Sequence, residues 1–386
     1  QKNTLKNEVL SFMRTYSISL PLDKRVSELS IGEKKLLALL KALYKKPDIL
    51  ILDEPTSYLP DFQVKTLLST ILSLKKKGLT ILFISHRWKE VGKVADRITI
   101  LKEGKVLGTF SQDEFRESLN RLIGDERTFS FIKEQRIGEV FFEISHIVYK
   151  KNKNIILDDV SLELRKGEIL SILSISGNGE KELEYIVSGF LLPTSGNIKI
   201  KGKEFTHITP SILRNYNISI IPTDTEYGIS IYALLWENMI VSKYKSPPFS
   251  YKGFLNFKHI RSYTDSRLKE YGLPYSPNVK ARSLSGGRMR RLILSRELLD
   301  NLDLIIAGNP TSSLDSGFTK KTLKKLVELS RYNNIGILLF LYNIDNALAI
   351  SDRILILYKG RIVKELKRGE FQRQKIMRYL VGEIDG

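Results

Sequence analysis

The feature that most constrains this chain is an internal repeat with a nearly constant spacing. Four segments of its first part recur later, displaced by 255, 255, 256 and 258 residues. Since chance does not hold four registers within three residues, we interpret the sequence as a tandem duplication. The repeated pairs are Leu29–Glu33 with Leu284–Arg288, Ile49–Ser57 with Leu304–Ser312, Asp96–Ile98 with Asp352–Ile354, and Leu122–Gly124 with Leu380–Gly382.

The two copies differ in how much of the repeat they contain. The second starts near Glu139 and carries a glycine-rich turn at Ser174–Gly179, whose counterpart would lie roughly 75–80 residues before Gln1. We therefore expect the first copy to lack nearly its front half, and the chain, which starts without Met, to be a piece of a longer protein. The expected organisation is an incomplete first copy at 1–110, a linker with a short helix at 111–138, and a complete second copy at 139–386.

Each copy has the pattern of an α/β domain. Apolar runs of strand length alternate with amphipathic stretches, which favours a mainly parallel sheet flanked by helices. Residues 34–45 carry leucines at helical spacing, after Ser30 as a possible N-cap. Residues 140–173 alternate apolar and polar positions, which indicates an antiparallel β layer. The expected strands are 49–52, 79–84 and 98–101 in the first copy, and 304–307, 335–341 and 354–357 in the second.

Composition narrows the function classes. The absence of Cys excludes disulfides, cysteine-bound metal and a cysteine nucleophile. No apolar run reaches the roughly 18 residues that span a bilayer, and no signal peptide opens the sequence, so we expect an intracellular protein. Lys and Arg number 62 against 43 Asp and Glu, a net charge of +19 that favours nucleic acid, nucleotides or an acidic membrane as partner.

Carboxylates follow the apolar run 49–52. Asp53 at the end of a strand could hold Mg²⁺, and Glu54 could polarise a water that attacks a γ-phosphate. The plain alternative is a buried strand that leaves through a common Asp-Glu-Pro turn. His86 follows the next strand and could touch the same phosphate, although a lone His is more often structural.

Small residues precede two expected helices. Ser30 and Gly32 in the first copy, and Ser285, Gly286 and Gly287 in the second, offer a hydroxyl and accessible backbone amides. Such helix N-termini bind phosphate well. Because glycine-rich helix starts are common, each of these segments alone is weak support for a nucleotide site.

The order of these motifs resembles that of the ATP-binding-cassette ATPases, and in detail that of the tandem cassettes of simple-sugar and nucleoside importers. The resemblance covers essentially the whole chain. It implies two P-loop NTPase domains in tandem, each with a mainly parallel sheet, an antiparallel β layer and a helical subdomain, that use ATP and Mg²⁺. The matching pieces are Leu36–Thr56, Ser219–Pro222 with Asp224 and Gly228, Glu237–Asn238, Pro247–Phe249 followed by Gly253–Leu255, and Ala281–Gly287.

In this family the two cassettes meet head to tail, so each ATP lies between the Walker motifs of one copy and the signature of the other. The resemblance implies a first, hydrolytic site that combines a Walker A motif outside this sequence with Asp53 as metal ligand, Glu54 as base and His86 as phosphate sensor. Its signature side would be Ser285, Gly286 and Gly287.

The second site would combine Gly177 and Gly179 of the glycine-rich turn with Ser30, Ile31 and Gly32. A phosphate-binding loop needs Lys followed by Ser or Thr, and this chain has Glu180 and Lys181 at those places. The counterparts of the residues that act in the first site are Gly308 for Asp53, Asn309 for Glu54 and Tyr342 for His86. We expect this site to bind nucleotide weakly or not at all, and not to hydrolyse it.

Tyr149 stands where the family places an aromatic that stacks on adenine, although packing within the β layer explains a strand Tyr equally well. The resemblance implies an import ATPase at the cytoplasmic face of the membrane, peripheral to permease subunits and indirectly coupled to an extracytoplasmic substrate-binding protein, with no specific nucleic acid. One alternative is a soluble tandem cassette acting on ribosomes or nucleic acid. Another is a decayed, non-hydrolysing relative with a structural role.

Overall fold

The protein is described here by a computed structural model, in which residues 2–16, 18–26, 29, 31–56, 59, 61–85, 87–102, 105–115, 137–152 and 154–383 are described. The chain forms two compact units, Gln1–Phe129 (unit 1) and Ser130–Gly386 (unit 2), each of which is considered by itself. Most of the expected linker, 111–138, lies outside the described residues. Among the described helices, none combines the length and the apolar character that crossing a membrane requires.

Unit 2 is built on a six-stranded sheet with the order β10-β13-β14-β7-β15-β16. All neighbouring strands run parallel except β16, which pairs antiparallel with β15. The strands expected at 304–307, 335–341 and 354–357 are confirmed as β13, β14 and β15. The strand bounds are β7 Ile169–Ser174, β10 Ile218–Ile221, β13 Leu304–Gly308, β14 Gly336–Leu341, β15 Arg353–Tyr358 and β16 Arg361–Lys367.

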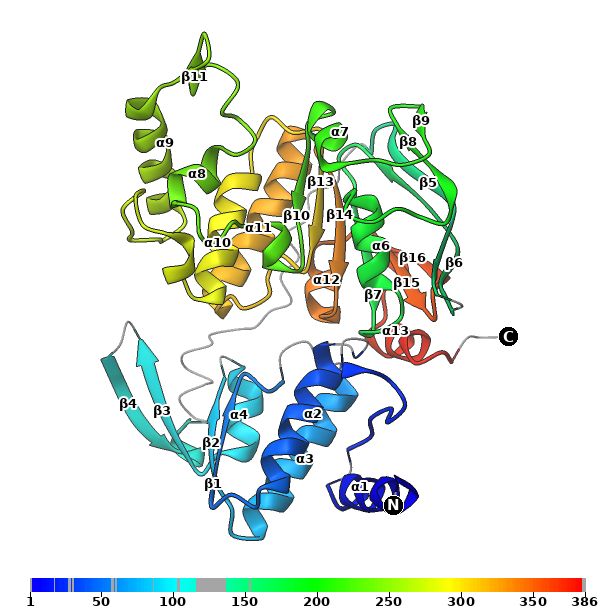
Figure 1. Ribbon diagram of the computed structural model, residues 1–386, viewed down its shortest axis with the longest axis vertical. Coiled ribbons are helices and arrows are strands. Elements are labelled where there is room, and N and C mark those ends of the chain that lie inside the picture. Colours follow the sequence, from blue (N-terminus) through cyan, green and yellow to red (C-terminus); the bar gives the residue numbers. More distant parts are fainter. Residues whose placement is uncertain are drawn as a thin grey trace. The chain divides into compact units, whose positions relative to one another are not determined.

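An antiparallel layer with the order β6-β5-β8-β9 accompanies this sheet, as the alternation in 140–173 predicted (Figure 1). A second, two-stranded hairpin is formed by β11 and β12. The bounds are β5 Val140–Lys151, β6 Asn154–Arg165, β8 Ser195–Ile200, β9 Lys203–Phe205, β11 Ser250–Tyr251 and β12 Phe254–Leu255.

Alternate residues of the central sheet face two different cores, because side chains of a strand point to opposite sides. One core joins the sheet to α6, α7 and the antiparallel layer, and the other joins it to the helices that follow β10. The helix bounds are α6 Glu180–Val187, α7 Pro210–Asn215, α8 Leu235–Ile240, α9 Phe257–Glu270, α10 Gly286–Glu297, α11 Ser316–Asn333, α12 Ile344–Ile350 and α13 Arg373–Leu380; short 3-10 turns are η2 Thr225–Tyr227, η3 Ala281–Ser283 and η4 Arg368–Glu370.

The described helices and strands of unit 1 follow in the same order as those from α9 to β16 of unit 2 (Figure 1). Its strands form two separate pairs, parallel β1–β2 and antiparallel β3–β4. The expected strands 49–52, 79–84 and 98–101 and the helix at 34–45 are confirmed. The bounds are α1 Lys2–Thr15, α2 Ile31–Tyr44, β1 Ile49–Asp53, α3 Asp61–Lys76, β2 Thr80–Ile84, α4 Trp88–Val94, β3 Arg97–Lys102 and β4 Lys105–Ser111.

Among the described residues of unit 1, only one face of the β1–β2 pair is covered. Leu50 and Leu52 pack with α2 and α3 in a single core, whereas the residues that point to the opposite side are 45–63% exposed: Ile49, Ile51, Leu82 and Ile84. Their counterparts in unit 2 are at most 4% exposed and belong to the core under α6 and the antiparallel layer: Leu304, Ile306, Leu338 and Phe340.

Candidate functional site

The glycine-rich turn of unit 2 connects β7 to α6, the position of a phosphate-binding loop. Gly177 and Gly179 have φ values of 99° and 93°, which only glycine adopts without strain. A Cβ on Gly179 would also lie 2.8 Å from the carbonyl oxygen of Ile156, so this glycine lets the turn pack on β6. The sequence therefore forms the backbone cradle that the motif predicted.

The side chain of Glu180 fills this cradle. Its Oε1 accepts a hydrogen bond from the Gly177 N–H at 3.0 Å, and its Oε2 accepts one from the Asn178 N–H at 2.9 Å. The side chain is buried, and burial raises the pKa of the carboxyl while the backbone N–H groups of Gly177 and Asn178 oppose the rise. The residue at the lysine place thus puts an anionic group where such loops bind phosphate.

A second carboxylate, from Glu184 one helical turn further on, lies beside β13. Its Oε1 accepts from the Thr223 N–H at 2.7 Å and its Oε2 from the Thr223 hydroxyl at 2.6 Å. A Cβ built on Gly308 would lie 2.3 Å from both Glu184 Oε1 and Thr223 Oγ1. Gly308 therefore has no side chain because Glu184 and Thr223 occupy that space.

Lys181 is turned away from the loop. Its Nζ lies 2.7 Å from Asp224 Oδ2, which also accepts a hydrogen bond from the Tyr185 hydroxyl at 2.5 Å. Burial alone would raise the pKa of Asp224, but these contacts with Lys181 and Tyr185 hold it below its ordinary value. In this structure Lys181 does not replace the missing loop lysine.

The remaining counterparts complete the lining. The Tyr342 hydroxyl lies 3.4 Å from Glu180 Oε1, and its pKa is raised well above the ordinary value by burial and by the neighbouring carboxyl groups. The Asn309 N–H donates to the Phe340 carbonyl at 2.8 Å. The structure therefore brings together the loop, the end of β13 and the end of β14, as the motif order implied.

A magnesium nucleotide does not fit these residues. The anion-binding amides already hold a carboxylate, and the place of the usual metal-binding Asp is a glycine packed against Glu184. A triphosphate would have to displace Glu180 from these amides against the cost of desolvation, and the metal position would still be filled by the Glu184 side chain.

In unit 1 the corresponding strand end keeps its acids. Asp53 ends β1 with an exposed side chain, and the Glu54 N–H donates to the Ile84 carbonyl at 2.9 Å. Glu54 has φ 46° and its counterpart Asn309 has φ 39°. The two copies thus place these residues with the same backbone geometry and differ in the side chains they present.

Lys35, which none of the sequence motifs indicated, lies beside this pair. Its Nζ donates to the Glu54 carbonyl oxygen, and its pKa is lowered by burial, with Glu54 and Asp53 opposing the shift. Its counterpart in unit 2 is Arg290, which is buried and donates to the carbonyl oxygens of Pro222 and Thr223. The repeat register could have identified both, because each is a cation six residues after the start of the LS motif.

Asp53 fits a magnesium site of the kind that binds nucleotides. Such sites use one or two carboxylates plus phosphate oxygens and water, and Asp53 supplies an accessible carboxylate at the carboxyl end of a parallel strand. The described residues hold no cluster of three or more acidic, His or Cys side chains that could bind a metal by themselves. The protein would therefore hold Mg²⁺ through Asp53 together with the phosphates of the bound nucleotide.

The other predicted residues are in varied surroundings. Ser285 is the N-cap residue of α10 and is exposed, but its side chain makes no capping hydrogen bond. A Cβ on Gly286 would have no atom within 4 Å. Gly287 lies close to the Ser313 carbonyl oxygen, which a Cβ would approach to 2.4 Å. Tyr149 lies on β5, half-buried against the core of the antiparallel layer. Ser30 and His86 lie outside the described residues, and of Gly32 only its place in α2 is described.

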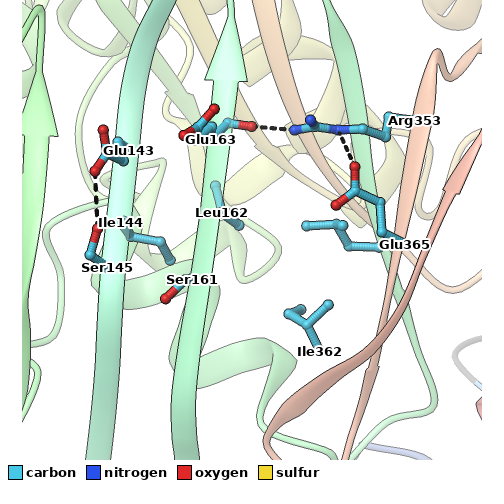
Figure 2. A pocket seen from close by; sticks show the side chains of 10 residues that line it. Glu143, Ile144, Ser145, Ser161, Leu162, Glu163, Arg353, Ile362 and Glu365 are labelled. Atoms are coloured by element: carbon cyan, nitrogen blue, oxygen red, sulfur yellow. Dashed lines mark hydrogen bonds and ion pairs between the residues drawn. The ribbon is translucent and has the colours of Figure 1, made fainter.

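A cavity of about 290 Å³ lies elsewhere, between the antiparallel layer and β15–β16 (Figure 2). Arg353 spans it, with its Nε 3.4 Å from Glu365 and 3.1 Å from the buried Glu168. None of its lining residues belongs to the candidate nucleotide site. Arg353 also donates to the carbonyl oxygen of Glu163 on β6, and this bond ties the two sheets together, so we assign this cavity a structural role.

A sequence model of the family described as "ABC transporter" matches residues 1–57 and 157–312, more than half of the chain. The chain belongs to the ABC transporter family. The cassettes of this family are ATP-hydrolysing transport ATPases.

Curated relatives of this ABC protein match over nearly its whole length. It is 32% identical over 366 residues to the nucleoside import ATP-binding protein NupA of Lactococcus lactis subsp. cremoris, covering 93% of this chain and 72% of the relative. It is 31% identical to the guanosine import ATP-binding protein NupO of Bacillus subtilis, covering 97% and 74%. A ribose import ATP-binding protein, RbsA of Caldanaerobacter subterraneus subsp. tengcongensis, is 30% identical, covering 98% and 76%.

Solved cassettes share the fold. The dimeric, post-hydrolysis structure of the ATP-binding cassette MJ0796 bound to ADP and phosphate superposes with a TM-score of 0.52 at 25% identity, covering 60% of this chain and 100% of that chain. A nucleotide-free cassette from another ABC transporter gives a TM-score of 0.51 at 20% identity, covering 64% and 97%. The α/β fold expected from the sequence, with its mixed sheets and helices, is confirmed.

Proposed function

We propose that this protein is the ATP-binding subunit of an ABC importer that energises the uptake of nucleosides or simple sugars. The names of relatives that match over more than nine-tenths of the chain support this role. They import nucleosides, guanosine and ribose, so the cargo class follows from them and not from the described residues, whose chemistry concerns the nucleotide.

We further propose that the protein carries two cassettes in tandem, with the boundaries 1–110 and 139–386 that the repeat predicts. The family model matches in two separate stretches. Two backbone hydrogen bonds support this proposal, because they join the residues that the repeat pairs: Glu54 N–H donates to Ile84 O at 2.9 Å, and Asn309 N–H donates to Phe340 O at 2.8 Å.

The open face of unit 1 supports an incomplete first copy. In unit 2, β7 pairs with both β14 and β15, whereas among the described residues β2 and β3 belong to separate sheets. The exposed Ile51 has a counterpart, Ile306, that is completely buried under elements absent from the described part of unit 1. We infer that equivalents of β7, α6 and the antiparallel layer cover this face in the working transporter.

The single observation that carries the catalytic assignment is the contrast between the two strand ends. Asp53 and Glu54 present carboxylates, while Gly308 and Asn309 present none. In our proposal Glu54 accepts a proton from the attacking water, and Asp53 orients the metal that neutralises charge on the phosphates. His86 would contact the γ-phosphate, and the signature segments with Ser30 and Ser285 would donate backbone N–H groups to nucleotide.

The second copy would then act without hydrolysis. Losing the loop lysine, the metal ligand, the base and the phosphate sensor together removes groups that work as a unit, and rates fall by orders of magnitude when such groups are lost. The carboxylate of Glu180 in the loop supports this role, because it competes with phosphate for the same amides.

Import ATP-binding subunits of ABC transporters work with membrane permease components, and we propose the same here, with a peripheral position at the cytoplasmic face. An extracytoplasmic substrate-binding protein would be coupled indirectly. The alternative, a soluble cassette protein acting on ribosomes or nucleic acid, is favoured by the net charge of +19.

The test compares equivalent residues of the two copies in the full-length protein. Glu54→Gln should lower kcat for ATP by roughly 10²–10⁴-fold, the range for removing a general base. Asn309→Ala, the matched change in the second copy, should change kcat by less than about twofold because no chemistry depends on that side chain. Equal losses in both variants, or an unchanged rate in Glu54→Gln, would refute the assignment.

A further inference from the structure

We propose that the carboxylate of Glu180 is a permanent internal ligand of the second phosphate-binding loop, which takes the place of a nucleotide phosphate and keeps the loop in its anion-bound conformation without nucleotide. This role of Glu180 is confined to the loop, goes beyond the proposed function and holds whichever cargo the transporter carries.

The geometry of the contact is that of an anion in a backbone nest. Both oxygens of Glu180 are used, one on the N–H of Gly177 and the other on the N–H of Asn178, at 3.0 and 2.9 Å. Consecutive amides of a turn with left-handed glycines converge on one point and bind anions there. Glu180 is 5% exposed, so water competes little for these amides.

Because Glu180 belongs to the same chain as the loop, its binding costs no entropy of association. Glu180 is the first residue of α6, so its carboxylate is tethered directly beside the turn it binds. An intramolecular ligand acts at an effective concentration of roughly millimolar or above, so a free phosphate of equal intrinsic affinity must exceed this concentration before it displaces the side chain. Glu184, on the same helix, fills the adjoining metal position with its carboxyl group.

Other parts of the fold depend on the conformation that Glu180 maintains. The Asn178 side chain donates to the Ile175 carbonyl at 2.8 Å and accepts from the Lys359 N–H at 2.8 Å. The Gly360 N–H donates to the Asn178 carbonyl at 2.9 Å. These bonds tie the loop to the turn between β15 and β16. Without an anion, the partial positive charges of the Gly177 and Asn178 N–H groups would repel one another, and this junction would loosen.

The experiment replaces the internal ligand and asks whether phosphate can take its place. In the full-length protein, Glu180→Ala should speed hydrogen exchange of the amides in 174–187 by roughly 10–100-fold, as expected for losing two bonds to a charged acceptor. Inorganic phosphate at about 10 mM should restore most of this protection in the variant and leave the wild type unchanged. Glu180→Gln should give an intermediate rise, because its NH₂ group faces one of the donor amides.

Glu182→Ala is the matched control. This acid lies on the same first turn of α6, and among the described contacts it accepts no hydrogen bond from the loop. Its exchange should equal that of the wild type, with and without phosphate. Glu180→Ala with unchanged protection, or with lost protection that phosphate does not restore, would overturn the proposal, since Glu180 would then be either dispensable or an ordinary packing residue.

Discussion

Glu184 is a carboxyl group whose charged form the fold does not favour. Burial raises its pKa to about 7, although the hydrogen bonds from Thr223 oppose the shift. Because the folded protein then holds this proton more tightly than the unfolded chain, whose value is about 4.5, protonation stabilises the fold. The contribution is complete below about pH 4.5 and is lost as the pH rises to about 7.

We therefore expect the free energy of unfolding to fall by on the order of 3 kcal/mol between pH 5 and 8, and to fall less in Glu184→Gln. Urea unfolding followed by the fluorescence of Trp236, in a Trp88→Phe background, reports unit 2 alone, because the chain has two Trp. Glu182→Gln, on the same helix, should keep the wild-type slope. Parallel pH profiles for wild type and Glu184→Gln would show that Glu184 is not the group that titrates.

The strands β1 and β13 have the same apolar pattern but different surroundings. The same substitution should therefore lower the free energy of unfolding by different amounts in the two strands. Ile306→Ala should destabilise unit 2 by about 2–5 kcal/mol, because it opens a cavity in a buried core. Ile51→Ala should cost less than about 0.5 kcal/mol in unit 1, because its side chain is 63% exposed.

Leu50→Ala is the control on the same strand, since Leu50 is 3% exposed and should cost as much as Ile306→Ala. Urea unfolding with Trp88 or Trp236 retained one at a time separates the two units. A large loss of stability in Ile51→Ala would mean that this face is already covered in solution, and would contradict the inference that additional elements are needed there.

The elements themselves were predictable because the repeat supplied each strand twice and hydrophobic periodicity fixed its type. Which faces of these strands are covered by other elements was not predictable. The run 49–52 predicts a strand buried on both sides, as 304–307 is, and nothing in its letters marks Ile51 as exposed. That difference depends on which other elements are present, so only coordinates could show it.

The site was predictable to the same degree. The sequence shows that an acid replaces the loop lysine and that Gly308 replaces an acid, but the direction of the Glu180 side chain follows from the turn's amides and needs three dimensions. Glu184 sits in an unremarkable helix. Its spacing of four from Glu180 places both on one face, yet the reason for Gly308 appears only when Glu184 and Thr223 fill the space beside it.

The whole molecule has a net charge of +19, which favours binding to an anionic surface. The charge is unevenly spread: residues 238–264 include five Lys or Arg and no Asp or Glu. Exposed aromatic side chains lie in the same stretch, with Tyr251 70% and Phe254 82% exposed on the β11–β12 hairpin. Basic residues beside interfacial aromatics suit an acidic lipid surface better than a protein face alone.

We expect the full-length protein to sediment with vesicles containing about one-third anionic lipid and not with neutral vesicles, and binding to fall more than about tenfold between 0.05 and 0.5 M salt as screening grows. Lys252→Glu with Lys258→Glu should weaken binding more than Lys203→Glu with Lys324→Glu, an equal change of charge elsewhere on unit 2. Bulk tRNA should not displace the protein at 0.15 M salt. If tRNA or ribosomes removed it from the vesicles there, the charge would serve nucleic acid, and the soluble alternative would replace the import role.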